Sequence, residues 1–317
     1  MIYRQWSITR LENEWPDARK CTASAAFLPI SPGRKTRLSL RPDSSPRVGE
    51  GERADLAKTI GIIQARMGSE RLPGKILAPL GGRPVLGLIA DRLRDARVDE
   101  WWLATSDDPA DDVTEAWGFE LGLRVFRGHP TEVLSRFVAI GEETGADWLV
   151  RATADNPFLD AACVDLLVDA RDASECAKQA DLLRLHGGLP LENEAASKTT
   201  PRLPVGYGVE LLRTDALGVA DREIPESQSH HRVHVTSWLA ANANVHAVPT
   251  PLDWPDRPDW RWTVDTYEDL AMARSAFRLF GANATGVDYP TMVEHLDAHP
   301  EITDMNRHVE QKKLEDG

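Results

Sequence analysis

The stretch TIGIIQARMGSERLPGKIL, residues 59–77, carries the clearest structural signal in the chain. It begins with TIGIIQA (59–65), a short apolar run rich in β-branched residues that is typical of a strand buried on both faces of a sheet. A loop rich in glycine and proline follows as far as Lys75, and PVLGLIADRLRDA (84–96) then shows the apolar spacing of a helix. The order strand, loop, helix predicts the first unit of an α/β fold.

Strand and helix patterns alternate after this first unit. The sequence predicts strands over 100–106, 123–128 and 147–154, and helices over 107–122, 131–145 and 159–171. Because regular alternation is the signature of right-handed βαβ units, we predict an α/β fold with a mostly parallel sheet flanked by helices. The later part is less regular. It is predicted to hold a turn-rich insertion over 186–208, a helix over 226–243, strands over 245–250 and 260–264, and a helix over 265–281 with Asp265 and Thr266 at its cap.

Composition divides the chain into three parts. Residues 1–57 mix Ser, Pro, Gly and Arg with few large apolar side chains, which predicts a disordered or poorly ordered N-terminal tail. Residues 58–300 carry the alternating pattern and are predicted to form one domain. Residues 301–317 are predicted to be a polar C-terminal tail.

The overall composition argues against several classes of protein. With 317 residues, 42% of them hydrophobic, the chain can bury a large core, which excludes disorder of the whole protein. The net charge is −13, although residues 1–58 alone carry +4 (11 Lys and Arg against 7 Asp and Glu), and an acidic body argues against coating of nucleic acid. No run approaches the ~20 apolar residues of a membrane span. The N-terminal residues lack the apolar core of a signal peptide, and the three cysteines show no Cys-x-x-Cys pattern. We therefore expect a cytoplasmic protein without nucleic-acid or membrane partners.

The loop that follows the first strand points to an anionic ligand. It carries Arg66, Arg71 and Lys75 among Gly68, Ser69, Pro73 and Gly74, and ligands of open α/β sheets bind at the carboxyl ends of the strands. Fixed cations and backbone N–H groups on such a loop suit a polyphosphate. The loop is not a P-loop, which has four residues between its glycines and Ser or Thr after the lysine, and no Gly-x-Gly-x-x-Gly occurs. From the pattern alone, a solvated basic turn stays an alternative.

QARMGSERLPGK (64–75) resembles the signature loop of the CMP-sugar synthetases, and it is still more similar to the spore-coat polysaccharide type of cytidylyltransferase. The resemblance runs from about Thr59 to about Phe280. It implies a nucleotide-diphospho-sugar transferase fold, CTP as the nucleotide, and possible pairing into a homodimer. It further implies that Arg66, Ser69, Arg71 and Lys75 bind the triphosphate, that Lys75, Arg66 and Arg71 support catalysis, and that Gln64 and Ala65 lie near the base.

Two aspartates are candidates for a metal site. Asp155 follows the predicted strand 147–154 and Asp265 follows the predicted strand 260–264, so both are expected where strand ends converge. Mg²⁺ in phosphate chemistry is typically held by one or two carboxylates together with the phosphates. Alternatively, Asp265 caps a helix and Asp155 forms an Asx turn before Pro157. The family resemblance favours Mg²⁺, since TADNPF (153–158) and TVDTYEDL (263–270) look like its metal-associated segments, and it adds Thr105 and Arg151 as weaker candidates for contacts with the nucleotide.

Two further segments, VGYGVELL (205–212) and HHRVHVTSW (230–238), resemble family segments on the acceptor side. The resemblance makes Glu210, Arg232 and His234 candidates for binding the acceptor. The family often has an acidic residue where Gly208 and Val233 stand here, and this departure bears on the identity of the substrate. His230 and His231 are expected on a helix surface, because no cysteine or carboxylate accompanies them at the spacing of zinc ligands.

Three functions remain open from the sequence. The first is a CTP-dependent cytidylyltransferase that activates a sugar acid or a related small anion, with phosphonates included, and releases pyrophosphate. The second is a glycosyltransferase of the same fold, against which the absence of any Asp-x-Asp in the chain argues. The third is a non-catalytic module that retains a nucleotide pocket.

Overall fold

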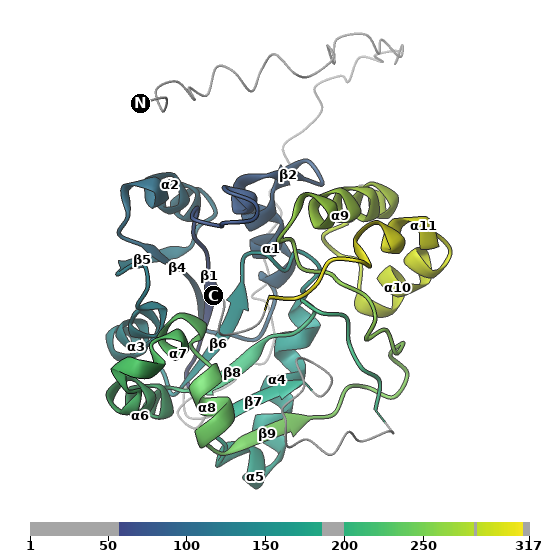
Figure 1. The fold of residues 1–317 in the computed structure, drawn as a ribbon. Coiled ribbons are helices and arrows are strands. Elements are labelled where there is room, and N and C mark those ends of the chain that lie inside the picture. Colours follow the sequence, from purple (N-terminus) through teal and green to yellow (C-terminus); the bar gives the residue numbers. More distant parts are fainter. Residues whose placement is uncertain (1–56, 186–199, 282–283, 313–317) are drawn as a thin grey trace, which may run out of the picture. The chain divides into compact units, whose positions relative to one another are not determined.

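In the computed structural model of the chain, residues 57–185, 200–281 and 284–312 are described. The predicted N-terminal tail lies outside these residues except for Ala57. Residues 186–199 of the turn-rich insertion also lie outside them. The described residues form a seven-stranded sheet with the order β5-β4-β1-β6-β8-β7-β9 (Figure 1). Its strands are β1 (Thr59–Gln64), β4 (Glu100–Ser106), β5 (Arg124–Gly128), β6 (Trp148–Thr153), β7 (Leu182–Leu185), β8 (Glu210–Arg213) and β9 (Val245–Val248). A separate small hairpin joins β2 (Pro79–Leu80) and β3 (Arg83–Pro84).

The sheet is parallel apart from one strand. β1 pairs in parallel with β4 and β6, β4 with β5, and β7 with β9, whereas β8 runs antiparallel to both β6 and β7. The first strand is buried along almost its whole length, as its continuous apolar sequence predicts. Because β8 is reversed, its first residue, Glu210, lies at the same edge of the sheet as the carboxyl ends of β1 and β6.

Helices cover both faces of the sheet. One face packs against α1 (Val85–Leu93), α2 (Asp112–Glu120), α4 (Ala161–Ala173), α9 (Tyr267–Phe280) and α10 (Tyr289–Asp297). The other packs against α3 (Val133–Thr144), α6 (Thr214–Glu223) and α8 (Ser237–Asn242). Short helices complete the described part: α5 (Glu175–Lys178), α7 (His230–His234), α11 (Pro300–Thr303), and the 3-10 turns η3 (Lys75–Leu77), η4 (Pro109–Asp111), η5 (Glu226–Gln228) and η7 (Asp304–Asn306). The α/β fold with a mostly parallel sheet flanked by helices is confirmed.

Two predicted elements are wrong. The helix predicted over 226–243 is interrupted at Val235, which has φ 56° and lies between α7 and α8. The Thr236 N–H donates to the carbonyl of His234 at 2.5 Å across this residue, so the chain makes a tight γ-type turn while the Val235 side chain stays fully buried. Residues 260–264 form no strand; Arg261 makes an isolated bridge with Val205, because the backbone partners of this segment are loops.

The folded part continues past residue 300, where the sequence suggested that a polar tail begins. Ile302, Thr303 and Asn306 are buried, and the chain remains described to Lys312. Within the described ranges, none of the helices combines the length and the apolar character needed to cross a membrane.

Candidate active site

The predicted site residues gather at the edge of the sheet where the parallel strands β1, β4 and β6 end. The loop 65–74 follows β1, and Asp155 comes two residues after the end of β6. The segment that leads to Asp265 lies beside them, because the Val264 N–H donates to the carbonyl of Asp155 at 2.7 Å. This edge is the usual position for ligands of open α/β sheets.

The loop after β1 is fixed by hydrogen bonds at its start. The Met67 N–H donates to Oδ1 of the buried Asp111 at 2.7 Å, and the Met67 carbonyl accepts from Ser69 N at 2.9 Å and from Gly74 N at 3.0 Å. Gly74 has φ 71°, in the left-handed region that glycine adopts without strain, and it leads directly into η3 with Lys75 as the first residue. The loop is therefore closed on itself, with Lys75 at its exit.

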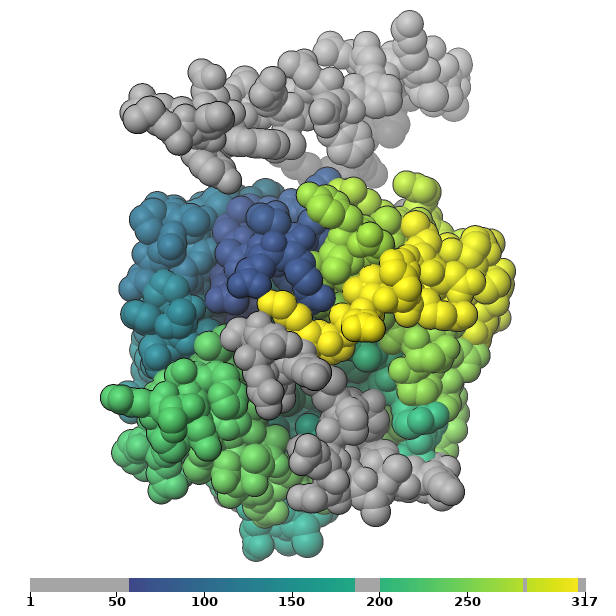
Figure 2. Space-filling model, in the orientation of Figure 1, coloured from purple at the N-terminus to yellow at the C-terminus, as the bar shows by residue number. Residues whose placement is uncertain are grey.

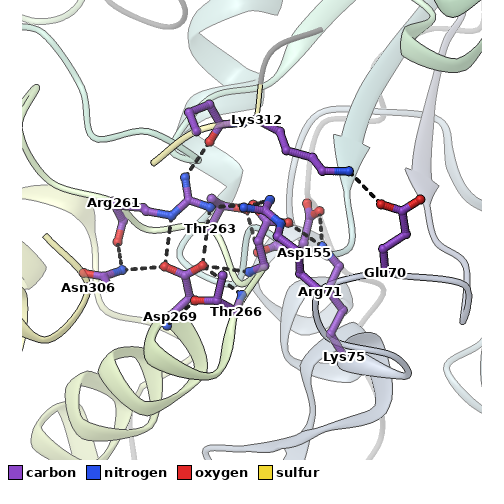
Figure 3. A network of polar contacts seen from close by, with 12 residues as sticks. Glu70, Arg71, Lys75, Asp155, Arg261, Thr263, Thr266, Asp269, Asn306 and Lys312 are labelled. Carbon is purple, nitrogen blue, oxygen red and sulfur yellow. Dashed lines mark hydrogen bonds and ion pairs between the residues drawn. The ribbon is translucent and has the colours of Figure 1, made fainter. Parts of the chain in front are cut away.

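Lys75 links the two aspartates that were predicted to hold a metal. Its Nζ lies 2.7 Å from Oδ2 of Asp155 and 2.7 Å from Oδ1 of Asp265, and its side chain is 11% exposed (Figure 3). Burial by itself would lower the pKa of Lys75, but the charges of the two carboxylates outweigh it and the pKa lies above its usual value. Burial by itself would raise the pKa of Asp155, but the ammonium of Lys75 outweighs it and the pKa lies below its usual value. Both groups are thus held in their charged forms.

Asp265 also forms ion pairs with two arginines. Nη2 of Arg71 lies 3.1 Å and Nη2 of Arg261 lies 2.6 Å from Oδ2 of Asp265. Arg261 also donates through Nε to Oδ1 of Asp269 at 2.9 Å, and Asp269 accepts the backbone N–H groups of Asp265 and Thr266 at 3.0 Å each. Thr266 is the N-cap of α9 in a capping box with Asp269. Asp265 therefore lies just before the helix cap, with its carboxylate facing the cations of the loop.

The C-terminal segment reaches back to this site. Nδ2 of Asn306 donates to Oδ1 of Asp269 at 2.8 Å, and Oε1 of Gln311 accepts from Nη1 of Arg261 at 2.5 Å. Lys312 pairs with Glu70 of the loop at 2.7 Å (Figure 3). On the face seen in Figure 2, the yellow C-terminal segment lies against the purple region that holds the loop. A part of the chain that the sequence suggested to be a tail thus contributes to the walls of the site.

The first residues of the loop differ in exposure. Ala65 is buried and extends the ladder of β1 by donating to the carbonyl of Ala104 at 3.1 Å, whereas Arg66 is exposed. Burial, together with the positive charge of Arg66, lowers the pKa of Arg136, a buried guanidinium that donates to the carbonyls of His129 and Pro130. Arg66 thus adds an exposed positive charge at the start of the loop.

A second polar group lies on the sheet surface beside this cluster. Nη1 of Arg151, on β6, lies 2.8 Å from Oε2 of Glu210 on β8, and its Nε donates to Oε1 of Gln64 on β1 at 3.3 Å. The ladder places Arg151 opposite Glu210 and Glu210 opposite Arg184 of β7. The fold thus brings together Gln64, Arg151 and Glu210, which were predicted on separate grounds. Arg184, which the sequence did not predict, lies next to Glu210 on the neighbouring strand.

The other predicted acceptor residues lie on α7. Arg232 pairs with Asp221 of α6 at 2.8 Å and with Glu132 at 3.5 Å, and it also donates to the carbonyls of Asp221 and Ile224. Its guanidinium therefore links α7 to α6 through an ion pair and hydrogen bonds. His234 ends α7, next to the turn at Val235. Beside it, Nδ1 of His231 lies 2.7 Å from the hydroxyl of Ser237, and burial lowers the pKa of His231.

Thr105, predicted near the nucleotide, lies inside the fold. Its side chain is fully buried, and its hydroxyl has no hydrogen-bond partner within the described ranges. A nucleotide could touch this hydroxyl only after the surrounding side chains had moved.

The site offers few ligands to a metal ion. Among residues 57–185, 200–281 and 284–312, no group of three or more His, Cys, Asp or Glu side chains could hold a metal ion. Asp155 and Asp265 form a pair instead: the oxygens that contact Lys75 are no more than twice 2.7 Å apart, since both contact the same nitrogen. Two hard carboxylate oxygens fit a cation such as Mg²⁺, which usually takes one or two carboxylates and completes its shell with phosphates and water.

Arg261 and Asp269 are two further site residues that the sequence did not predict. Arg261 lies in an aromatic run, WRWTV, whose pattern predicts a strand, and Asp269 lies in TVDTYEDL (263–270), a segment in which only Asp265 is predicted to have a role. A signal was present, since an arginine between two buried tryptophans implies a buried partner of opposite charge.

Comparisons with known proteins show what the chain is similar to. Residues 60–253 match the cytidylyltransferase family, a range that ends before Arg261 and Asp265. The spore coat polysaccharide biosynthesis protein SpsF of Bacillus subtilis is 31% identical over 228 residues, which cover 69% of this chain and 86% of that protein. The 3-deoxy-manno-octulosonate cytidylyltransferase of Escherichia coli is 25% identical over 253 residues, which cover 77% of this chain and 96% of that protein. The solved structure of a cytidylyltransferase from Leptospira borgpetersenii is 26% identical and superposes with a TM-score of 0.67 over 81% of this chain and 99% of that one.

Proposed function

Because the chain belongs to the cytidylyltransferase family, we propose that it transfers CMP from CTP to a small anionic acceptor, a sugar acid or a related phosphonate, and releases pyrophosphate. The family relatives include an enzyme named for a sugar acid, 3-deoxy-manno-octulosonate, which supports this class of acceptor. The new bond joins an acceptor oxygen to the α-phosphorus. The bond from the α-phosphorus to the bridging oxygen breaks, pyrophosphate leaves with that electron pair, and the proton of the acceptor passes to solvent.

One observation carries the proposal. Lys75, at the exit of the loop after β1, lies within ion-pair distance of both Asp155 and Asp265, which come from distant parts of the sequence. A triphosphate bound on the loop would therefore lie next to the two carboxylates that a metal needs. Such a combination of fixed cations and metal-binding carboxylates is what phosphoryl chemistry requires, since most of its catalysis is positioning and charge stabilisation.

The roles of the loop residues follow from their positions. Arg66, Ser69, Arg71 and Lys75 bind the triphosphate, and Lys75, Arg66 and Arg71 stabilise the charge that builds up as pyrophosphate leaves. Gln64 and Ala65 lie at the end of β1 and contact the base. Thr105 and Arg151 are assigned weaker contacts around the nucleotide, and the burial of Thr105 makes its contact the less direct of the two.

Asp155 and Asp265 would hold Mg²⁺, which supplies neutralisation of the phosphate oxygens when it is bound. The protein's own contribution is to keep Asp155 ionised and both carboxylates in place. The lowered pKa of Asp155 serves the first purpose, and the hydrogen bonds that the backbone N–H groups of Asp265 and Thr266 donate to Asp269 serve the second.

The acceptor is assigned to the polar surface at Arg151 and Glu210, with Arg232 and His234 of α7 beside it. Glu210 accepts hydrogen bonds from acceptor hydroxyls, and Arg151 pairs with the acceptor's negative group. Arg232 is already paired with Asp221 and Glu132, so its role here is to hold α7, and His234 with it, in position. Association of two chains into a homodimer remains part of the proposal.

The test is pyrophosphate release. The full-length protein is mixed with each of the four nucleoside triphosphates and Mg²⁺, against a panel of sugar acids and phosphonates. We expect release with CTP and at least one acceptor, and a loss of roughly a hundredfold or more in Lys75→Ala. The matched control is Lys178→Ala, because Lys178 is an exposed helix lysine paired only locally with Glu175.

Other results would change the assignment. Undiminished pyrophosphate release from CTP in Lys75→Ala would remove it. Consumption of a nucleotide sugar without pyrophosphate release would show a glycosyltransferase, and CTP binding without turnover over the whole panel would show a non-catalytic module.

A further inference from the structure

Lys75 contacts both of the carboxylates that are assigned to the metal ion, Asp155 and Asp265. Its Nζ is 2.7 Å from one oxygen of each carboxylate, and little of its side chain is exposed (Figure 3). We propose that Lys75 has a second role: before the nucleotide binds, its ammonium holds the metal site as an exchangeable counter-cation, which it yields to the divalent ion when the triphosphate arrives.

The segments that carry the two carboxylates are also held by contacts that do not involve Lys75. Asp265 is held by Arg261 at 2.6 Å and by the hydrogen bond from its own N–H to Asp269 at 3.0 Å. Asp155 is held through its backbone, since its carbonyl accepts from Val264 N at 2.7 Å. Removal of the Lys75 charge would therefore leave two carboxylates on neighbouring backbone segments that stay in contact through Val264 and Asp155.

Of the cations around these carboxylates, Lys75 is the one suited to leave. Arg261 is buried, and its guanidinium is committed to Asp269 and Gln311 as well as to Asp265. Of the two carboxylates, Arg71 contacts Asp265, with its Nη2 3.1 Å from Oδ2. Lys75 contacts both carboxylates through a single ammonium on a flexible four-carbon stem, and it follows directly on the loop assigned to the triphosphate.

An exchange of this kind couples the metal to the nucleotide. A divalent ion that binds without CTP must displace the ammonium from both carboxylates, and the ammonium then lacks a partner. Once the triphosphate is bound, its oxygens can accept the ammonium and also complete the shell of the ion. CTP should therefore raise the affinity for the metal, and by thermodynamic linkage the metal should raise the affinity for CTP by the same factor.

The experiment measures binding of Mn²⁺ to the full-length protein, from the electron paramagnetic resonance signal of free Mn²⁺, with and without CTP and in the absence of acceptor. The variants are Lys75→Met, which removes the charge and keeps the length of the stem, Lys75→Arg, Arg71→Met and Asp155→Asn. Thermal unfolding is recorded for each variant.

Without CTP, we expect Lys75→Met to bind Mn²⁺ at least about tenfold more tightly than the wild type, because a positive charge next to both ligand oxygens has been removed. Arg71→Met should show a smaller gain, since Arg71 contacts one carboxylate and is more exposed. Lys75→Arg should keep weak binding. The gain in affinity on addition of CTP should be smaller in Lys75→Met than in the wild type. Damage to the fold would lower the affinity for Mn²⁺, so it cannot imitate the expected increase.

The inference rests on the proposed function in one respect, the position of the metal between Asp155 and Asp265. Mn²⁺ binding that is unchanged in Asp155→Asn would overturn that position and the exchange with it. Loss of binding in Asp155→Asn with unchanged or weaker binding in Lys75→Met would overturn the exchange alone. An equal gain in Arg71→Met would also overturn it, because the effect would then reflect general charge.

Discussion

Nη2 of Arg261 lies 2.6 Å from Oδ2 of Asp265, and the same guanidinium reaches Oδ1 of Asp269 through Nε at 2.9 Å. One buried arginine therefore bridges a carboxylate assigned to the metal and a fully buried carboxylate in the first turn of α9. The carboxylate of Asp265 can exchange partners when ligands bind. The buried carboxylate of Asp269 contacts protein groups and is not assigned to a ligand. The bridge ties the geometry of the site to the stability of the fold.

Replacement of Arg261 by Met should destabilise the protein by about 3 kcal/mol or more, because Asp269 would be left as a buried charge without its cation. The measurement is the free energy of unfolding in urea. In the control Arg257→Met, a partly exposed ion pair with Asp297 is lost, and the change should stay below about 1 kcal/mol. The double variant Arg261→Met/Asp269→Asn should recover part of the loss. Equal losses of unfolding free energy in Arg261→Met and Arg257→Met would show that the bridge stabilises the fold no more than a partly exposed ion pair does.

Asp111 should control the conformation of the loop without touching a substrate. Its carboxylate accepts from Met67 N, from the hydroxyl of Ser106, and from the hydroxyl of Thr114 at 3.0 Å. Asp111→Ala leaves these donors buried without an acceptor, which should cost about 1–3 kcal/mol of stability, and the loosened loop should raise KM for CTP.

The measurements for Asp111→Ala are urea unfolding and pyrophosphate release as a function of CTP concentration. Asp112→Ala is the matched control, because its neighbouring carboxylate is 68% exposed and pairs with Arg127 on the surface. A KM for CTP that is the same in the two variants would contradict the role of Asp111.

Gly206 should tolerate no side chain. It has φ 91°, and a Cβ built there would lie 2.6 Å from the backbone N of Thr263 and 3.0 Å from Oδ1 of Asn156. Since Thr263 and Asn156 flank the two metal-assigned aspartates, Gly206→Ala should destabilise the fold by more than about 2 kcal/mol and lower turnover. Gly208→Ala is the control: nothing lies within 4 Å of a Cβ there, and the expected change is within about 0.5 kcal/mol. Urea unfolding of both variants decides the matter, and equal stability of the two would refute the prediction.

Two cysteines should differ strongly in reactivity. Burial, reinforced by the negative charge of Asp160, raises the pKa of the Cys163 thiol well above its usual value, whereas Cys176 is exposed. The thiolate is the reactive form, so its population at Cys163 is small at pH 8 and grows only at higher pH. Alkylation by iodoacetamide, followed peptide by peptide by mass spectrometry, should label Cys176 readily and Cys163 only in denaturant. Comparable rates in the native protein would contradict the buried position of Cys163.

The sequence predicted the half of the fold that begins with β1 because its signals are local. Each strand there is a short apolar run, and each helix repeats its apolar residues at helical spacing, so burial and periodicity coincide. The later part was harder to predict. A tight turn at Val235 interrupts a predicted helix and leaves the Val235 side chain buried. The partners of residues 260–264 include Val205 and Asp155, which lie more than fifty residues away in the sequence. Neither effect has a signature in a short window of sequence.

By itself, the sequence determined the order of the α/β units, the cationic loop from Arg66 to Lys75, and the two aspartates that are candidates for the metal. These features depend on local patterns and on motifs that are contiguous in the chain. The tertiary structure alone decided that Lys75 lies between those aspartates, that Arg261 and Asp269 fix one of them, and that residues 306–312 reach the same place. Contacts between groups 80 to 190 residues apart arise when whole elements pack, and the ion pairs that result depend on distances that only packing sets.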